Sequence, residues 1–312
     1  MGAGAVIKYH IEAFLCAGAE IVGICATENS INAKNISDLY NIPYFANVSK
    51  MITGSKADGY LISVDATSVY TVLTKFKEVT FPILIEKPGF TDSIHFDDQL
   101  KNSSRNRFVA FNRRHYESVE HFKNAYDANG GFLEVDIVEN ADLSNFAEVS
   151  KALINNSCHM IDLVGYLCGN YQLQDFQFST FSNSFHARIY NSSGKLLGNL
   201  NIYFNSPINT SIKLYTLEAF FELRPIEVCS SFNQLKIKEP TSELPIRIYE
   251  PYWDRAESGK IISDSRFKPG FFNQASNFLN CKLENKKLCT LEAASLTFNL
   301  TRNISLFIKN HL

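Results

Sequence analysis

Two stretches of the sequence place a residue able to handle protons in an apolar setting. The first, LIEKPGF at 84–90, ends an apolar run with Lys87 and Pro88. The second, NNSCHMIDL at 155–163, carries His159 within a helical pattern. An imidazole titrates near neutral pH and a lysine ammonium polarises an oxygen. Lys87 and His159 therefore suit the proton transfer that accompanies the interconversion of an alcohol and a ketone.

Both residues also have simpler interpretations. Pro88 favours an extended conformation at Lys87, and a lysine in this position also suits a surface salt bridge. A histidine on a helix, taken alone, is more often a hydrogen-bonded core residue. The neighbouring motifs must therefore decide between catalysis and structure for Lys87 and His159.

A glycine-rich turn precedes the first expected helix, 7–17. In Gly2-Ala3-Gly4 the first glycine allows a tight turn and the second lets a pyrophosphate approach the backbone, while the N-terminus of the helix attracts phosphates. The third position, usually Gly or Ala, is Ile7, so the pattern alone also fits an ordinary turn of small residues. The residues predicted to contact a dinucleotide here are Gly2, Gly4, Ala5 and Val6.

Further cofactor contacts are expected where apolar strands end, because doubly wound sheets bind ligands at the carboxyl ends of their strands. An acid after the second strand would bind the adenine ribose, but that slot holds Ala26-Thr27. Glu28 follows slightly late and fits a solvated loop equally well. No arginine nearby fits a 2′-phosphate, so the choice between NAD and NADP stays open. The predicted cofactor contacts at strand ends are Ala26, Thr27, Val64, Glu86 and Lys87.

The order of the apolar runs predicts an α/β protein with two domains. Buried strands alternate with helical patterns at 1–111, which predicts a Rossmann-type dinucleotide-binding domain with a parallel sheet. Strand-like runs follow one another at 112–312, which predicts an α+β substrate and oligomerisation domain with a large, mainly antiparallel sheet. A final helix, 291–308, is expected to pack back on the first domain. The expected strands are 20–26, 59–64, 82–85, 107–111, 132–138, 176–181, 186–190, 196–204, 211–221 and 235–238.

The first strand of the Rossmann-type domain is missing from this pattern. A glycine turn of this kind should follow a central strand, but the sequence begins at Met1. A sheet without its central strand would leave backbone groups unpaired on both neighbouring strands, which is costly. We therefore expect a truncated or misassigned start.

Composition narrows the class of protein. The 312 residues carry 30 basic and 32 acidic side chains, which gives a net charge of −2. This balance argues against binding to nucleic acid or to an anionic membrane surface. No apolar run approaches the roughly 20 residues that span a bilayer, and no basic region marks a signal peptide. Seven cysteines without a CxxC spacing predict no metal site and a reducing, cytoplasmic location.

Four motifs, in order along the chain, resemble those of the Gfo/Idh/MocA family (glucose–fructose oxidoreductase, inositol dehydrogenase and MocA). They are Gly2-Ala3-Gly4 with His10, Glu86-Lys87-Pro88, VAFNRR at 109–114 and NNSCHMIDL at 155–163. The resemblance implies an NAD- or NADP-dependent oxidoreductase. It would transfer hydride between nicotinamide and a hydroxyl or ketone carbon of a sugar, polyol or nucleotide-sugar, in surface-polysaccharide metabolism. The resemblance also implies a homodimer or homotetramer.

The same resemblance assigns roles to individual residues. Lys87 would hydrogen-bond the reacting oxygen, and His159 would act as general acid and base. Asn155 stands where many relatives carry Asp, one helical turn before His159 on the same face, and an amide cannot accept a proton. Arg113 and Arg114 are candidate anion binders, although one of them also suits a surface ion pair. The catalytic set is Lys87, His159 and Asn155, the substrate set is Lys87, Asn112, Arg113, Asn155 and His159, and Arg114 joins the cofactor set.

Several other side chains have open roles. Asp162 is expected to be structural, capping or pairing within its own helix. Tyr70 stands where many relatives carry His and either contacts the cofactor or packs. Four aromatic residues suit stacking on a sugar, although aromatic residues in sheets more often lie in cores or interfaces. These aromatic residues are Tyr203, Tyr215, Tyr252 and Trp253.

Two further functions compete with a sugar oxidoreductase. A non-catalytic sugar- or dinucleotide-binding protein, or a regulatory one, would keep the same fold; Asn155, Ile7 and the missing strand favour it. A reductase of another carbonyl or imine substrate is a third hypothesis. Turnover of a dinucleotide with a panel of sugars discriminates among them.

Overall fold

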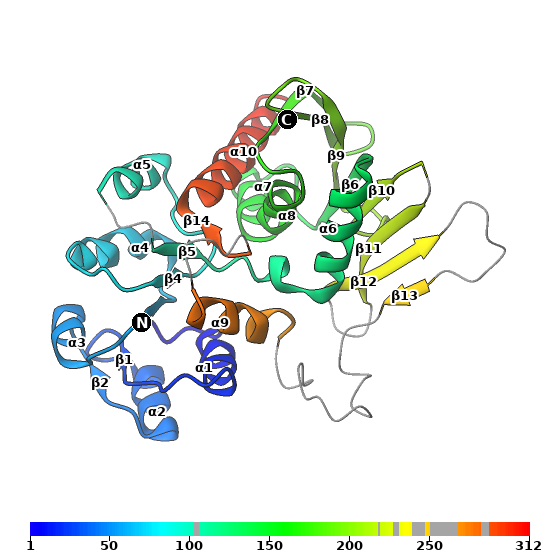
Figure 1. Ribbon diagram of the computed structural model, residues 1–312. Coiled ribbons are helices and arrows are strands. Elements are labelled where there is room, and N and C mark those ends of the chain that lie inside the picture. The colour runs from blue at the N-terminus through cyan, green and yellow to red at the C-terminus, as the bar shows by residue number, and fades with distance from the viewer. Residues whose placement is uncertain (103–105, 218, 227–230, 239–246, 250–267, 282–286) are drawn as a thin grey trace. The chain divides into compact units, whose positions relative to one another are not determined.

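The computed structural model describes residues 1–102, 106–217, 219–226, 231–238, 247–249, 268–281 and 287–312 (Figure 1). The chain forms two compact units, each with its own strands and hydrophobic core. Unit 1 comprises Met1–Asn112 and Ser265–Ser295. Unit 2 comprises Arg113–Asp264 and Leu296–Leu312.

Unit 1 alternates short strands with helices, which confirms the predicted Rossmann-type pattern. Its elements are α1 (Ile7–Cys16), β1 (Ile24–Cys25), α2 (Ile31–Tyr40), β2 (Tyr44–Phe45), α3 (Val48–Gly54), β3 (Tyr60–Ile62), α4 (Ala66–Leu73), β4 (Ile83–Ile85), α5 (Ser93–Asn102), β5 (Arg107–Val109), α9 (Phe271–Leu279) and β14 (Cys289–Thr290). Strands β3, β4 and β5 pair in parallel, and β14 joins β5 antiparallel. β1 and β2 form a separate parallel pair.

Met1 and Gly2 lie between the two sheets of unit 1. The N–H of Gly2 donates to the carbonyl of Cys25 at the end of β1 (2.8 Å), and the N–H of Ser63 after β3 donates to the carbonyl of Met1 (2.7 Å). The Met1 amino group donates to the carbonyl of Leu61, and burial lowers its pKa from 8.0 to about 6. The missing first strand was expected to leave backbone groups of β1 and β3 unpaired. Met1 and Gly2, which lie where that strand would end, bond to some of these groups.

Unit 2 is built on an eight-stranded sheet. Its elements are α6 (Glu117–Asn129), β6 (Phe132–Glu139), α7 (Phe146–Ala152), α8 (Cys158–Cys168), β7 (Tyr171–Ser179), β8 (Ser184–Asn191), β9 (Leu196–Phe204), β10 (Ser211–Tyr215), β11 (Phe220–Ile226), β12 (Ser231–Lys238), β13 (Arg247–Tyr249) and α10 (Leu291–Lys309), whose first five residues belong to unit 1. The strand order is β13-β12-β11-β10-β6-β9-β8-β7. Every neighbouring pair is antiparallel except β6 and β9, which confirms the mainly antiparallel sheet.

One face of this sheet packs against helices of unit 2 (Figure 1). Strand β6 alternates as a half-buried strand should, and Leu133, Val135 and Ile137 enter the core shared with α6, α8 and α10. Burying each such side chain contributes roughly 1.5–3 kcal/mol. The next position on this face is Glu139, so an acid takes the place of an apolar residue at the end of the strand.

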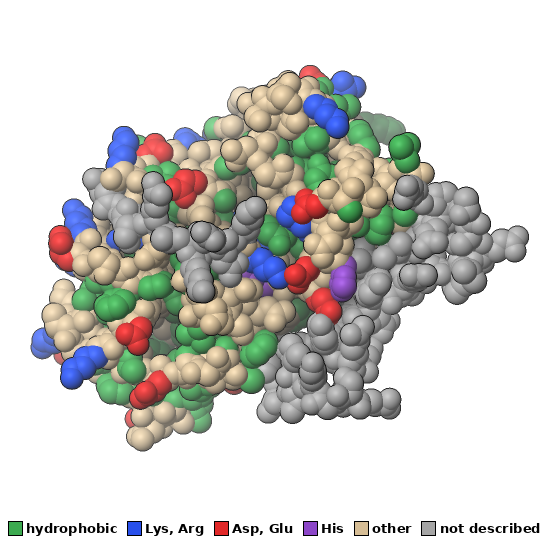
Figure 2. Space-filling model, in the orientation of Figure 1, with side chains coloured by type: hydrophobic (Ala, Val, Ile, Leu, Met, Phe, Trp, Pro, Cys, Tyr) green, Lys and Arg blue, Asp and Glu red, His purple; other side chains and the backbone are tan. Residues whose placement is uncertain are grey.

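The opposite face of the sheet carries polar side chains that bond to one another. Asn201 Nδ2 donates to Glu134 Oε1 and to Asp136 Oδ1 (2.5 and 2.9 Å), and Lys213 Nζ donates to Asp136 Oδ2 (2.7 Å). His186 Nδ1 lies 2.9 Å from Asn201 Oδ1. On the surface drawn in Figure 2, basic and acidic side chains of the described residues are interspersed rather than gathered by sign.

Candidate active site

The predicted cofactor contacts of unit 1 lie at the strand ends of its two sheets, which Met1 and Gly2 join. In the register of β3 and β4, Ile62 pairs with Ile85, so both strands end together. The N–H of Glu86 donates to the carbonyl of Ile62 (2.8 Å). Ser63, directly after β3, bonds to Met1, and Gly2 bonds to the end of β1. The structure therefore brings the glycine turn, Ala26, Val64 and Glu86-Lys87 to the carboxyl edge, where such sheets bind ligands.

The two glycines of the turn differ in what surrounds them. Gly2 has φ +90°, and a Cβ there would lie 1.9 Å from the carbonyl oxygen of Ser63. Gly4 is exposed, and a Cβ there would meet nothing within 4 Å. Gly2 is thus required by the fold itself, whereas the open space at Gly4 fits the approach of a pyrophosphate to the start of α1. This turn fits a dinucleotide, with Ala5 exposed and Val6 half-buried beside it.

Glu86 does not simply neutralise the neighbouring lysine. His10 Nε2 of α1 donates to Glu86 Oε1 at 2.6 Å, with His10 only 1% and Glu86 14% exposed. The His10 ring also packs on Phe271 of α9, with centroids 4.6 Å apart. His10 thereby ties the end of β4 to α1 next to Lys87, which is half-buried and joined to Pro88 by a cis peptide bond.

The residues at the end of β1 are held by the next strand. The N–H of Ala26 donates to the carbonyl of Phe45 (3.2 Å), and the Tyr44 hydroxyl donates to the carbonyl of Thr27 (2.6 Å). Glu28 is exposed. Tyr70, whose role the sequence left open, packs within unit 1: its hydroxyl donates to Asp98 (3.0 Å), and its ring stacks on His95 at 4.0 Å.

His159 and Asn155 lie on one continuous helical stretch of unit 2. The predicted helix at 149–167 is helical throughout, but residues Leu153–Ser157 form a π-helical turn, called here the π-turn, between α7 and α8. The π-turn takes up part of the spacing from Asn155 to His159, and the expectation that the two side chains share one face of the helix stays a prediction. Bonds in a π-helix run from i to i+5, so the turn is wider by one residue.

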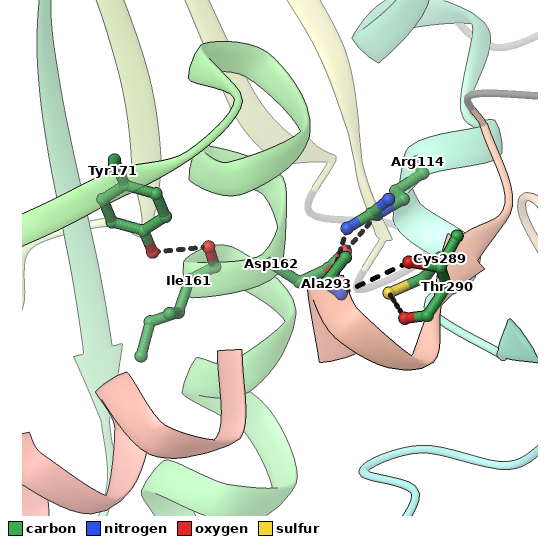
Figure 3. Close-up of polar contacts among 7 residues, drawn as sticks. All are labelled: Arg114, Ile161, Asp162, Tyr171, Cys289, Thr290 and Ala293. Atoms are coloured by element: carbon green, nitrogen blue, oxygen red, sulfur yellow. Dashed lines mark hydrogen bonds and ion pairs between the residues drawn. The ribbon is translucent and has the colours of Figure 1, made fainter. Parts of the chain in front are cut away.

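The two consecutive arginines have different surroundings. Arg114 donates from Nε and Nη2 to Asp162 Oδ2 and Oδ1 at 2.7 and 2.6 Å, and the two side chains are 5% and 0% exposed (Figure 3). Arg114 is therefore not a surface ion-pair member, and Asp162 pairs outside its own helix. Each charge needs this bidentate partner, because a lone charge in such a buried position would be costly. A contact between Arg114 and a cofactor stays a prediction.

Other predicted substrate residues make local contacts. Asn112 Nδ2 donates to the carbonyl of Pro269 within unit 1 (2.9 Å), while Arg113 in unit 2 is half-buried. Elsewhere in Figure 3, the Tyr171 hydroxyl donates to the carbonyl of Ile161 in α8 (2.9 Å). In unit 1, Thr290 Oγ1 accepts from the N–H of Ala293 (3.3 Å) and caps the start of α10 (Figure 3).

Among the aromatic candidates, Tyr203 is half-buried and Tyr215 is exposed, while Tyr252 and Trp253 lie outside the described residues. Within the described ranges, no group of three or more His, Cys, Asp or Glu side chains is placed to hold a metal ion. None of the described helices combines the length and the apolar composition that a bilayer crossing requires. Cys25, Cys158 and Cys289 are buried, whereas Cys16 is exposed.

The sequence interpretation missed Glu139, a buried acid beside the π-turn. Ser157 Oγ donates to Glu139 Oε1 (2.5 Å) and Asn156 Nδ2 donates to Glu139 Oε2 (3.2 Å). Burial raises the pKa of Glu139, while bonds from Ser157 and Asn156 and the charge of Arg113 oppose the rise. The signal was present in the alternation of FLEVDIVE at 132–139, where Glu139 follows three core-facing apolar residues.

Comparison with known proteins supports the fold and the dinucleotide edge. A model of the Gfo/Idh/MocA family, described as an oxidoreductase family with an NAD-binding Rossmann fold, matches residues 1–102. No curated protein matches the chain.

Solved structures resemble the whole chain at low sequence identity. UDP-N-acetylglucosamine 3-dehydrogenase GnnA from Acidithiobacillus ferrooxidans is 14% identical with a TM-score of 0.70, covering 98% of this chain and 95% of its own. The WlbA dehydrogenase from Bordetella pertussis, in complex with NADH and UDP-GlcNAcA, is 17% identical with a TM-score of 0.70, covering 100% and 94%. A putative NADPH-dependent oxidoreductase from Desulfitobacterium hafniense is 13% identical with a TM-score of 0.75, covering 100% and 94%.

These structural likenesses show a shared fold across both units. The family match covers the residues that form the glycine turn, the His10–Glu86 bond and the Glu86-Lys87-Pro88 stretch. Residues 1–102 thus match the Gfo/Idh/MocA family of oxidoreductases with an NAD-binding Rossmann fold, and the chain as a whole shares its fold with the solved dehydrogenases.

Proposed function

We propose that the protein transfers hydride between NAD or NADP and a hydroxyl or ketone carbon of a nucleotide-sugar, sugar or polyol, in surface-polysaccharide metabolism. The observation that carries the proposal is the place of Lys87. It follows β4 at the same sheet edge as the open glycine turn, and the residue before it is fixed by His10. A cation held at the ligand-binding edge suits contact with a reacting oxygen.

The chemistry assigns separate tasks to the side chains. When bound, the nicotinamide supplies or accepts the hydride. Oxidation of an alcohol carbon also releases the hydroxyl proton, which the imidazole of His159 accepts and returns in the reverse direction. Lys87 donates a hydrogen bond to the oxygen as its charge changes. Asn155 can orient a hydroxyl but cannot take up the proton, so His159 carries this task in our proposal.

A nucleotide-sugar is the substrate class that we favour. Two proteins of similar fold are named for UDP-sugars, one as a UDP-N-acetylglucosamine 3-dehydrogenase and one in complex with UDP-GlcNAcA. Arg113 supports this choice, because a guanidinium binds phosphate or carboxylate oxygens in a bidentate manner. We propose Arg113 as the anion contact, and neutral polyols as weaker substrates for that reason.

Two linked measurements test the proposal. Fluorescence titration of the purified protein with NADH and with NADPH would show binding of at least one of them and would decide the cofactor. Incubation with the oxidised form and a panel of UDP-hexoses, hexoses and inositols would then generate reduced nicotinamide. Binding of neither dinucleotide would contradict the proposal at its first step.

Asn155 favours a second candidate, a non-catalytic dinucleotide- or sugar-binding protein. An amide in place of the acid removes one proton acceptor from the helix that carries His159. This candidate predicts tight binding of NADH with no turnover of any sugar. The homodimer or homotetramer implied by the family resemblance is part of neither argument, and light scattering of the purified protein would decide it.

A further inference from the structure

We propose that Glu139 is a positioning residue for this reaction: from the end of strand β6 it fixes the π-turn that carries Asn155 and leads into His159. The inference rests on the proposed function, because the residues that it positions are those assigned to the reaction. Glu139 would not touch the substrate. It would act through the hydrogen bonds that it accepts from the π-turn.

Glu139 lies where an apolar residue would normally stand. It follows Leu133, Val135 and Ile137 on the core-facing side of β6, and it is 4% exposed. A carboxylate in such a position is costly unless hydrogen bonds compensate for the lost water. The hydrogen-bond partners of Glu139 therefore indicate the role of this buried carboxylate.

The partners of Glu139 come from the π-turn. Its two oxygens are used separately: Oε1 accepts from Ser157 Oγ at 2.5 Å, and Oε2 accepts from Asn156 Nδ2 at 3.2 Å. A backbone bond from Ser157 adds to these contacts. One carboxylate thus holds two consecutive residues of a turn whose backbone departs from α-helical geometry. Such π-helical turns occur frequently at functional sites.

The backbone around Glu139 is itself held by hydrogen bonds. The N–H of Asn205, after β9, donates to the Glu139 carbonyl (2.9 Å), and Asn205 Nδ2 donates to the carbonyl of Ala141 (2.8 Å). β6 lies in the middle of the sheet, between β10 and β9. A side chain on a rigid central strand can hold a helix turn more accurately than one on a loop.

The charge of Glu139 reaches a second predicted site residue. Arg113 opposes the rise in its pKa, so the guanidinium charge acts on this carboxylate. The next residue, Arg114, is bound to Asp162 of α8. Both arginines thus interact with groups at the helical stretch that carries Asn155 and His159. Arg113 acts through its charge on Glu139, and Arg114 acts through its hydrogen bonds to Asp162. Glu139 of β6 therefore places an acid beside this helical stretch.

The test compares Glu139→Leu with Glu139→Gln in the full chain. Leucine removes every acceptor, while glutamine keeps an acceptor for Ser157 and can bond Asn156 after rotation of either amide. A misplaced catalytic group costs up to about 100-fold in rate. We expect kcat to fall about 10- to 100-fold in E139L with KM for the dinucleotide unchanged, and E139Q to restore most of it.

A second readout is independent of turnover. Hydrogen exchange of backbone amides at 153–159 should be about tenfold faster in E139L, as expected for loss of a charge-assisted hydrogen bond. Ile137→Ala is the matched control: it weakens the same strand and face without touching the π-turn, so kcat should be kept. If E139L does not fold, Ser157→Ala removes one donor and should change both readouts in the same direction.

Three results would overturn the inference. These are unchanged kcat in E139L, an equal loss of kcat in I137A, and unchanged exchange at 153–159. If the wild type turns over no substrate, the proposed function fails on its own. The exchange comparison then decides about Glu139 alone: faster exchange in E139L supports the anchor, and unchanged exchange rejects it.

Discussion

At the scale of single residues, the two glycines of the glycine turn have different roles: Gly2 is required by the fold, and Gly4 leaves space for a ligand. Gly2→Ala forces a side chain into φ +90° and into the backbone of Ser63. We expect a loss of about 1–3 kcal/mol in the free energy of unfolding. Gly4→Ala meets open space, so the free energy of unfolding should stay nearly constant while dinucleotide binding weakens by roughly tenfold. Urea unfolding and NADH titration of both variants would check this, and equal effects on folding would contradict it.

The Arg114–Asp162 pair leads to a prediction about stability. Arg114→Ala leaves the fully buried Asp162 without its bidentate partner, and the loss should be about 3–5 kcal/mol. Lys123→Ala breaks the more exposed ion pair with Asp127 and should cost about 0.2–1 kcal/mol. Denaturant unfolding would compare the two variants. Similar losses would show that burial of the pair matters less than its geometry indicates.

At the scale of elements, the sequence predicted the type of most strands and helices but not their detail. Alternation in FLEVDIVE indicated β6 correctly, because period two is a direct consequence of the pleat. The π-turn left no comparable signal, since residues 149–167 have the pattern of one amphipathic helix. Strand β1 is two residues long instead of the seven expected at 20–26, because its pairing with β2 spans two residues and its further bond, among the described residues, is to Gly2.

The buried carboxyl of Glu139 leads to a predicted pH dependence of stability. Its folded-state pKa is raised above the ordinary 4.5, chiefly by burial. The folded protein therefore holds this proton at pH values where the unfolded chain has lost it. Stability from this group is present at low pH and falls as pH rises through the raised pKa. Denaturant unfolding should be compared between wild type and E139Q from about pH 4, near the ordinary carboxyl value, to about pH 8. Wild type should lose stability relative to the variant as pH rises, and a constant difference would contradict the raised pKa.

At the scale of the whole molecule, local signals identified the ligand edge better than they identified individual partners. Lys87, Gly2 and Gly4 stood out because strand ends and glycine turns follow directly from the order of residues. The partners of Arg114 and Glu139 did not, because they lie 48 and 17–18 residues away in the sequence. Such pairings follow from packing, which a single sequence does not display.

The central claim is that Lys87 acts on a sugar oxygen at a dinucleotide-binding edge. The most direct test is turnover of UDP-sugars with NAD and NADP by wild type, Lys87→Ala and the exposed control Lys77→Ala. We predict that K87A binds the dinucleotide but loses about 10²- to 10⁴-fold in kcat, while K77A behaves as wild type. Turnover in K87A equal to that of wild type would contradict the claim.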